Sequence, residues 1–142
     1  MKRILLIATG GTIACKQTAS GLAPQLGAKE LLSYVRDRAE NVESIELFRM
    51  DSSNVQPEEW RAIAQAVADN MHNADGIVIT HGTDTMAYTS SMLSFMLRGI
   101  KIPVVLTGAQ YPMGMDGSDA AANLGDALTA ARELSGGVYI CL

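Results

Sequence analysis

The 142-residue sequence lacks several features that would mark particular classes of protein. It has only two cysteines, Cys15 and Cys141, too few for a disulfide framework, so we expect both to be small buried apolar residues. It has no cluster of lysines and arginines, and its net charge of −4 argues against a nucleic-acid partner. No histidines, cysteines and carboxylates are spaced like metal ligands, so we expect no metal.

Long apolar runs are also missing. The first run, Ile4 to Ala8, follows two positive charges, but Gly10-Gly11 ends it too early for the apolar region of a signal peptide. No other stretch approaches the roughly 18 apolar residues of a membrane span. The sequence therefore predicts a cytoplasmic protein without a membrane partner.

What is present is the composition of a globular domain, with 48% hydrophobic and 18% charged residues. Short apolar runs alternate with longer stretches of helical periodicity. We expect strands over 4–8, 44–50, 76–80, 102–107 and 137–142, and helices over 28–38, 57–73, 84–98 and 118–134.

This alternation, with strands that are apolar on both faces, predicts an α/β fold: a three-layer sandwich with a mostly parallel sheet, flavodoxin-like or Rossmann-like. Ligands of such sheets bind beyond the carboxyl ends of the strands. Four polar segments follow predicted strands and are expected to meet in one crevice: Thr9–Thr12, Asp51–Asn54, His81–Thr85 and Gly108–Gln110.

The first of these segments ends in a possible nucleophile. Gly10 and Gly11 allow the backbone to approach a ligand closely, and Thr12 carries a hydroxyl that can attack once a base takes its proton. Alone, this pattern is weak, because phosphate-binding turns use similar backbone. The three-glycine dinucleotide fingerprint and the Gly-Lys-Ser/Thr P-loop are both absent.

The turn around His81 is richer. The segment Thr80–Met86 contains three hydroxyls and one carboxylate, and the N-terminus of the following helix would stabilise an anion there. An ordinary helix cap at Thr83 or Asp84 would explain them equally well, and the same alternative holds for residues 51–54. His81 is expected to fix the turn by hydrogen bonding rather than to act as a base.

Two segments together carry a resemblance to a known family. Thr9-Gly10-Gly11-Thr12-Ile13-Ala14 and His81-Gly82-Thr83-Asp84-Thr85-Met86 resemble the signatures of the bacterial L-asparaginase family (type I/II asparaginase/glutaminase), in the same order and at about the same spacing. The resemblance covers essentially all of residues 1–142. It implies an asparaginase amino-terminal domain that is truncated, without the family's carboxyl-terminal domain.

The resemblance implies an amidohydrolase that converts L-asparagine to L-aspartate and ammonia through a threonine nucleophile and an acyl-enzyme. No cofactor is implied, L-glutamine is a second candidate substrate, and the full-length parent would be a homodimer or homotetramer. Thr12 matches the nucleophile, while Thr83 and Asp84 match the second threonine and the aspartate that holds the substrate's α-amino group.

The resemblance also implies the remaining substrate contacts. Asp51, Ser52 and Ser53 match the loop that grips the α-carboxylate. The backbone N–H groups of Gly11 and Thr83 would be the oxyanion donors.

Two departures from the family pattern stand out. Leu22 occupies the position of a loop tyrosine that assists the nucleophile, and no lysine follows Lys101, whereas the family has one beyond the fifth strand that pairs with the Thr83 and Asp84 positions. We therefore expect the isolated chain to be inactive or nearly so.

Two other functions stay open. The first is the ammonia-liberating subunit of a tRNA-dependent amidotransferase, although that subunit usually carries an extra amino-terminal domain and the first strand here begins at about residue 4. The second is a non-enzymatic domain that binds a small ligand such as a nucleotide or flavin. Thr83-Asp84 argues against it, because it places a carboxylate where a phosphate would lie.

Overall fold

A five-stranded parallel sheet forms the centre of the molecule. The structure, a computed structural model, describes all of residues 1–142. The sheet has the order β4-β1-β5-β6-β7, and every neighbouring pair of strands is parallel. Its strands are β1 (Ile4–Gly10), β4 (Val42–Met50), β5 (Gly76–Thr80), β6 (Pro103–Thr107) and β7 (Gly137–Ile140).

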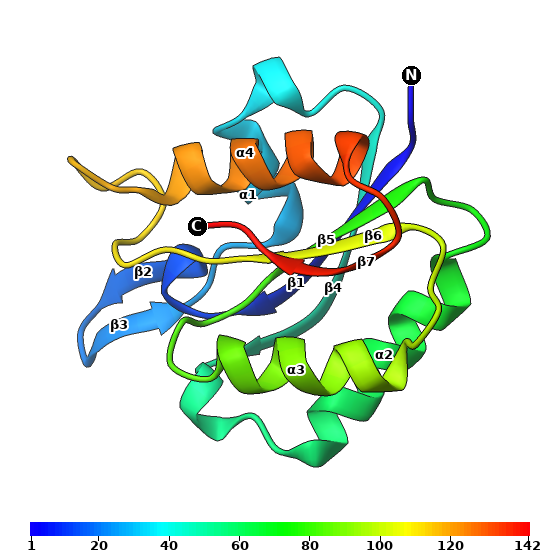
Figure 1. Cartoon of the computed structure of the whole chain (residues 1–142). Helices are drawn as coiled ribbons and strands as arrows, with labels where there is room; N and C mark the ends of the chain where they lie inside the picture. The colour runs from blue at the N-terminus through cyan, green and yellow to red at the C-terminus, as the bar shows by residue number, and fades with distance from the viewer.

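Helices cover both faces of this sheet. Helices α1 (Ala28–Ser33) and α4 (Ala120–Glu133) lie on one face, and α2 (Pro57–Asn70) and α3 (Met86–Met96) lie on the other (Figure 1). Each face has its own hydrophobic core, and the two cores meet only through the sheet. The predicted three-layer α/β fold is confirmed.

The alternation of side chains along β1 explains why two layers of helices are needed. Ile4, Leu6 and Ala8 belong to the core beneath α1 and α4, whereas Leu5 and Ile7 belong to the core against α2 and α3. All seven residues of β1 are buried, as are all residues of β5 and β6. Strands that are buried on both faces are typical of parallel sheets enclosed by helices.

The largest differences from the predicted elements lie within residues 15–38. Residues 15–24 form an antiparallel hairpin, β2 (Cys15–Thr18) and β3 (Gly21–Pro24), where no strand was expected. The hairpin's base is held by the Gln25 and Leu26 N–H groups, which both donate to the Ala14 carbonyl. The helix predicted over 28–38 ends at Ser33, and a separate 3-10 turn covers residues 36–38.

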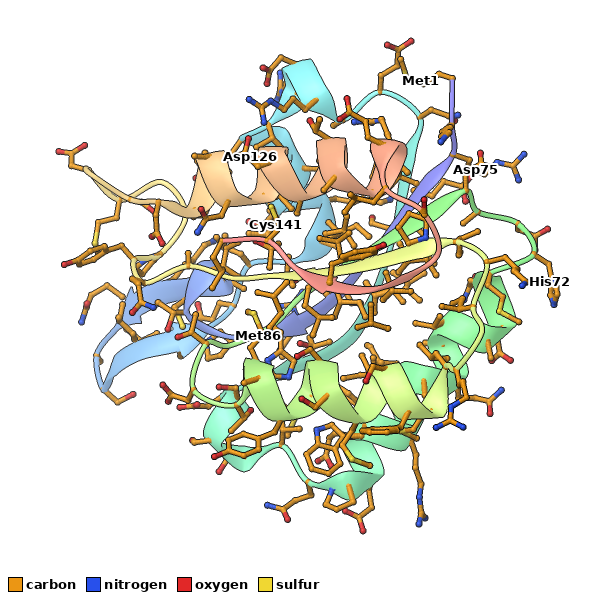
Figure 2. The ribbon with its side chains drawn as sticks, viewed as in Figure 1. Met1, His72, Asp75, Met86, Asp126 and Cys141 are labelled. Atoms are coloured by element: carbon orange, nitrogen blue, oxygen red, sulfur yellow. The ribbon has the colours of Figure 1, made fainter.

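Two further observations complete the fold. None of the helices is both long enough and apolar enough to cross a membrane. Cys15 is buried, Cys141 is half-buried, and both are free thiols. Cys141 packs against the core beneath α4 (Figure 2).

Candidate active site

A small pocket of about 150 Å³ opens at the carboxyl end of the sheet. Its walls come from the segments that follow β1, β4 and β5 and from the β2–β3 hairpin. Three of the four predicted polar segments therefore meet, while residues 108–110 do not line the pocket. The lining residues are Gly11, Thr12, Cys15, Leu22, Pro24, Asp51, Ser52, Gly82, Thr83 and Asp84.

Two glycines allow the strand ends to come this close. Gly11 has φ +80°, and a Cβ there would lie 2.5 Å from the backbone N of Gly82. A Cβ on Gly82 would in turn lie 2.4 Å from the Ser52 Oγ. The backbones after β1 and β5 and the Ser52 side chain are thus packed at distances that no larger residue permits.

Thr12 begins a 3-10 turn over Thr12–Ala14, and its side chain is half-buried at the pocket wall. The prediction that the Gly11 N–H is an oxyanion donor was wrong. This N–H donates to the Met50 carbonyl at 3.0 Å and so is not available to a ligand. By contrast, no protein group accepts a hydrogen bond from the N–H of Thr12 or of Thr83.

The segment after β4 contributes Asp51 and Ser52 but not Ser53. The Asp51 Oδ1 accepts hydrogen bonds from the Ser53 N–H and hydroxyl, each at 3.0 Å, and so caps the 3-10 turn over residues 52–54. Ser52 is only 3% exposed, and its carbonyl accepts the Thr85 hydroxyl at 2.8 Å. This segment therefore both caps a turn, through Asp51, and lines the pocket.

The segment after β5 is different, because neither Thr83 nor Asp84 acts as a helix cap. The N-cap position of α3 is Thr85, and no side chain makes a capping hydrogen bond there. Asp84 is exposed and Thr83 is half-buried, and both line the pocket. The polar groups of these two residues remain available to a ligand.

His81, directly before this turn, is completely buried. Its Nδ1 lies 2.7 Å from the Gly82 carbonyl oxygen, and its Nε2 lies 2.9 Å from the Thr89 hydroxyl. Burial lowers the pKa of the imidazole, although the bond to Gly82 partly opposes that shift. The ring is therefore neutral at physiological pH, and it holds the turn as the sequence predicted.

Sequence reasoning missed some of the pocket's walls. Cys15 and Pro24 line the pocket although no sequence signal pointed to them, and Leu22 of the hairpin lines it beside them. Burial, with a smaller contribution from Asp51, raises the pKa of the Cys15 thiol, which donates to the Gly11 carbonyl at 3.3 Å. The thiol therefore stays protonated. Because only a thiolate is an effective nucleophile, Cys15 serves as a packing residue.

Comparisons with known proteins identify the family of the chain. A family model described as the asparaginase amino-terminal domain matches residues 3–142. The chain belongs to the asparaginase family.

Among individual proteins, the chain is similar to the L-asparaginase of Thermococcus kodakarensis, with 46% identity over 141 residues, 97% of this chain and 43% of the relative. It is also similar to a glutamyl-tRNA(Gln) amidotransferase component from Archaeoglobus fulgidus, with 41% identity over 143 residues, 98% of this chain and 34% of the relative. The chain therefore spans less than half the length of these relatives.

Solved structures give the same picture. The thermostable L-asparaginase from Thermococcus kodakarensis superposes with a TM-score of 0.91 at 46% identity, covering 99% of this chain and 44% of that one. The probable cytoplasmic L-asparaginase from Campylobacter jejuni superposes with a TM-score of 0.84 at 33% identity, covering 100% of this chain and 44% of that one.

Proposed function

We propose that this chain is the amino-terminal domain of a longer amidohydrolase that converts L-asparagine to L-aspartate and ammonia, with L-glutamine as a second candidate substrate. The observation that carries the proposal is the gathering of Thr12, Thr83, Asp84 and Ser52 around one pocket from three strand ends. The similarity to proteins named L-asparaginase supports it. By the same analogy, the full-length enzyme is a cytoplasmic homodimer or homotetramer that needs no cofactor.

The reaction has two steps. The Thr12 Oγ attacks the carbon of the substrate's side-chain amide, the hydroxyl proton passes to the departing nitrogen, and ammonia leaves. A water molecule then attacks the resulting ester, releasing L-aspartate and returning the proton to Thr12. Splitting the hydrolysis in this way replaces one difficult displacement by two easier ones.

The pocket offers a partner for each charged part of the substrate. The free N–H groups of Thr12 and Thr83 serve as oxyanion donors, and such a donor contributes about 2.7–4 kcal/mol to acyl transfer. Asp84 holds the α-ammonium group. Ser52 holds the α-carboxylate, because Ser53 bonds to Asp51 and does not line the pocket.

The proton acceptor for Thr12 is the part of the machinery that this chain does not supply. Both ring nitrogens of His81 are engaged, and the hairpin presents Leu22 where the family has a tyrosine. We therefore propose that a base from outside residues 1–142 completes the site, and that the isolated chain hydrolyses L-asparagine very slowly or not at all.

The test is ammonia release from L-asparagine by the full-length enzyme and its variants. Thr12→Ala should lower turnover by at least a thousandfold, whereas Thr12→Ser, which keeps a hydroxyl, should retain part of it. Thr129→Ala on α4 is the matched control, since its hydroxyl bonds only to the Gly125 carbonyl within its own helix. Hydroxylamine should trap the acyl group as aspartyl hydroxamate. Normal turnover by Thr12→Ala would sink the assignment.

The ammonia-liberating component of an amidotransferase is the second candidate, favoured by the 41% identity to a protein named for that role. An enzyme of that kind would liberate ammonia for a partner that acts on charged tRNA. Full ammonia release by the purified protein, unchanged when partner and tRNA are added, supports the free asparaginase. Release that requires them supports the amidotransferase.

A binding domain without catalysis is the third candidate. A ligand that binds only the folded state raises the unfolding temperature, so thermal shifts with L-aspartate and with nucleotides separate the two functions. Stabilisation by L-aspartate alone is the result expected here, because Asp84 and Ser52 complement its two α-groups.

A further inference from the structure

A chain of hydrogen bonds runs from the surface helix α2 to the wall of the pocket. The Trp60 Nε1–H donates to the Thr89 Oγ1 at 2.9 Å, and the Thr89 Oγ1 lies 2.9 Å from the His81 Nε2. The His81 Nδ1 lies 2.7 Å from the Gly82 carbonyl oxygen. His81 and Thr89 are both completely buried, so water does not compete for these bonds.

The groups at the two ends of this hydrogen-bond network determine the position of every proton in it. The indole N–H of Trp60 can only donate, and the carbonyl of Gly82 can only accept. His81 must therefore carry its proton on Nδ1 in order to bond Gly82. Its Nε2 then accepts the hydroxyl proton of Thr89, whose oxygen accepts from Trp60. The network thus selects one neutral tautomer of the histidine.

The bond to Gly82 also sets the direction of the next N–H. A trans peptide is planar, with its C=O and N–H pointing in opposite directions, and the chain contains no cis peptide bond. Since the Gly82 carbonyl is held on the side of the buried imidazole, the Thr83 N–H points the other way. Gly82 and Thr83 both line the pocket, and no protein group accepts that N–H.

We infer that His81 is a positioning residue that aims the Thr83 N–H at the developing oxyanion, with Thr89 and Trp60 fixing its tautomer. This inference rests on the proposed function. His81 is itself well anchored, because its backbone N–H donates to the Thr107 carbonyl at 2.9 Å. The imidazole therefore fixes the position of the Gly82–Thr83 peptide relative to the sheet. It exchanges no proton with the substrate.

Substitutions at His81 in the full-length enzyme test the inference. His81→Phe keeps a buried ring but removes the donor, and should lower kcat about tenfold, less than the loss of a whole oxyanion donor. KM for L-asparagine should stay within about twofold, because the interaction forms only in the transition state. His81→Asn places an amide N–H near the Nδ1 position and should restore kcat to within about threefold of wild type.

A second readout does not depend on activity. Long-range nitrogen–proton NMR spectra of the wild-type protein should show the His81 proton on Nδ1. Thr89→Val removes the hydroxyl at nearly constant volume and should change the Nε2 chemical shift, while Thr89→Ser should leave it in place. A proton on Nε2 in the wild-type protein would overturn the inference directly.

Two controls separate this inference from general destabilisation and from the proposed function. Ile63→Val loosens the same core without touching the network and should leave kcat unchanged. An equal loss of kcat in Ile63→Val and His81→Phe would overturn positioning by His81. If Thr12→Ala abolishes turnover but His81→Phe keeps full kcat, only the inference fails. Normal turnover by Thr12→Ala instead sinks the proposed function, and this catalytic use of His81 with it.

Discussion

The two ends of the parallel sheet carry hollows of opposite character. The pocket at the carboxyl end is small, about 150 Å³, and eight of its ten lining residues are not hydrophobic. At the amino end, where α2 and α3 finish, a larger hollow of about 360 Å³ contains no hydroxyl and no carboxylate. Figure 2 shows His72, which lines the larger hollow, on the opposite side of the molecule from the β2–β3 hairpin.

The volume of a hollow does not by itself indicate where reactive groups gather. The larger hollow is walled by methionine, leucine and isoleucine side chains, with His72, Arg98 and Lys101 around them. Cations close to helix C-termini have an ordinary explanation in the helix dipole. The smaller pocket instead brings free N–H groups, hydroxyls and two carboxylates together from separate strand ends, which is the arrangement that the proposed amide hydrolysis would use.

The largest expected difference between the two ends comes from a pair of glycines with nearly equal φ. Gly11, in the pocket, has φ +80°, and Gly99, in the larger hollow, has φ +79°. A Cβ on Gly11 meets the Gly82 backbone, whereas a Cβ on Gly99 meets nothing within 4 Å. Gly11→Ala should lower turnover at least a hundredfold and stability by about 3 kcal/mol. Gly99→Ala should cost only about 1–2 kcal/mol and leave turnover unchanged.

Turnover assays and urea denaturation of the two glycine variants check this contrast. Equal effects of both substitutions on turnover would show that backbone strain, rather than close packing at the pocket, decides the outcome.

The next effect concerns Asp119, which holds the loop that follows β6. Burial acts to raise the pKa of Asp119, but hydrogen bonds from the Gln110 and Tyr111 N–H groups outweigh burial and lower it. Asp119→Asn weakens these bonds and should lower the free energy of unfolding by about 1–3 kcal/mol. The exposed Asp116, replaced by Asn, is the control and should change stability by less than about 0.5 kcal/mol.

A smaller effect depends on pH. Burial holds the pKa of His81 below its ordinary value of 6.5, so the unfolded chain takes up a proton before the folded chain does. This contribution to stability is complete above about pH 6.5 and is lost as the pH falls toward the folded-state pKa. Its slope is at most about 1.4 kcal/mol per pH unit.

Urea denaturation between pH 7.5 and 5.5 measures that slope. It should be shallower in His81→Asn and should persist in His72→Asn, a substitution at the exposed histidine of the other end. Identical profiles for wild type and His81→Asn would contradict the assignment.

The smallest effect is expected in the larger hollow itself. Lys101 is exposed and makes no hydrogen bond or ion pair within the protein, so Lys101→Ala should change stability by less than about 0.5 kcal/mol. Turnover and the thermal shift with L-aspartate should both be unchanged. A loss of either would show that the amino end of the sheet takes part in function after all.

Much of the fold was predictable because the parallel strands have a strong signature. Runs such as Ile77-Val78-Ile79 are too apolar for any position exposed to water, and the rule that ligands lie beyond strand ends placed Thr12 and Thr83 side by side. The hairpin was not predictable, because Lys16, Gln17 and Thr18 show no apolar alternation. The hydrogen bonds from Gln25 and Leu26 to the Ala14 carbonyl, which close its base, also have no signature in the residue types.

The site was predictable in its residue types but not in its hydrogen bonds. Nothing in the sequence indicates that the Gly11 N–H is already bonded to Met50. A cap within residues 51–54 was one expectation, but the sequence did not show which residue would be the cap, and the structure assigns it to Asp51. Likewise, the His81 Nε2 is bonded to Thr89 of α3, which in turn accepts from Trp60 of α2, and these residues lie far apart along the sequence. Such details depend on tertiary distances, which local sequence patterns do not encode.

The β2–β3 hairpin has a consequence for how this site can evolve. Three walls of the pocket are strand ends of the central sheet, where a change of even one atom, as at Gly11, disturbs the core packing. The hairpin pairs only with itself, and Leu22 at its edge is half exposed. Substitutions at exposed hairpin positions such as Leu22 are therefore expected to change the shape of the pocket at little cost in stability. If the proposed reaction is correct, new substrate preferences should arise through the hairpin, while the strand ends keep the reacting groups in place.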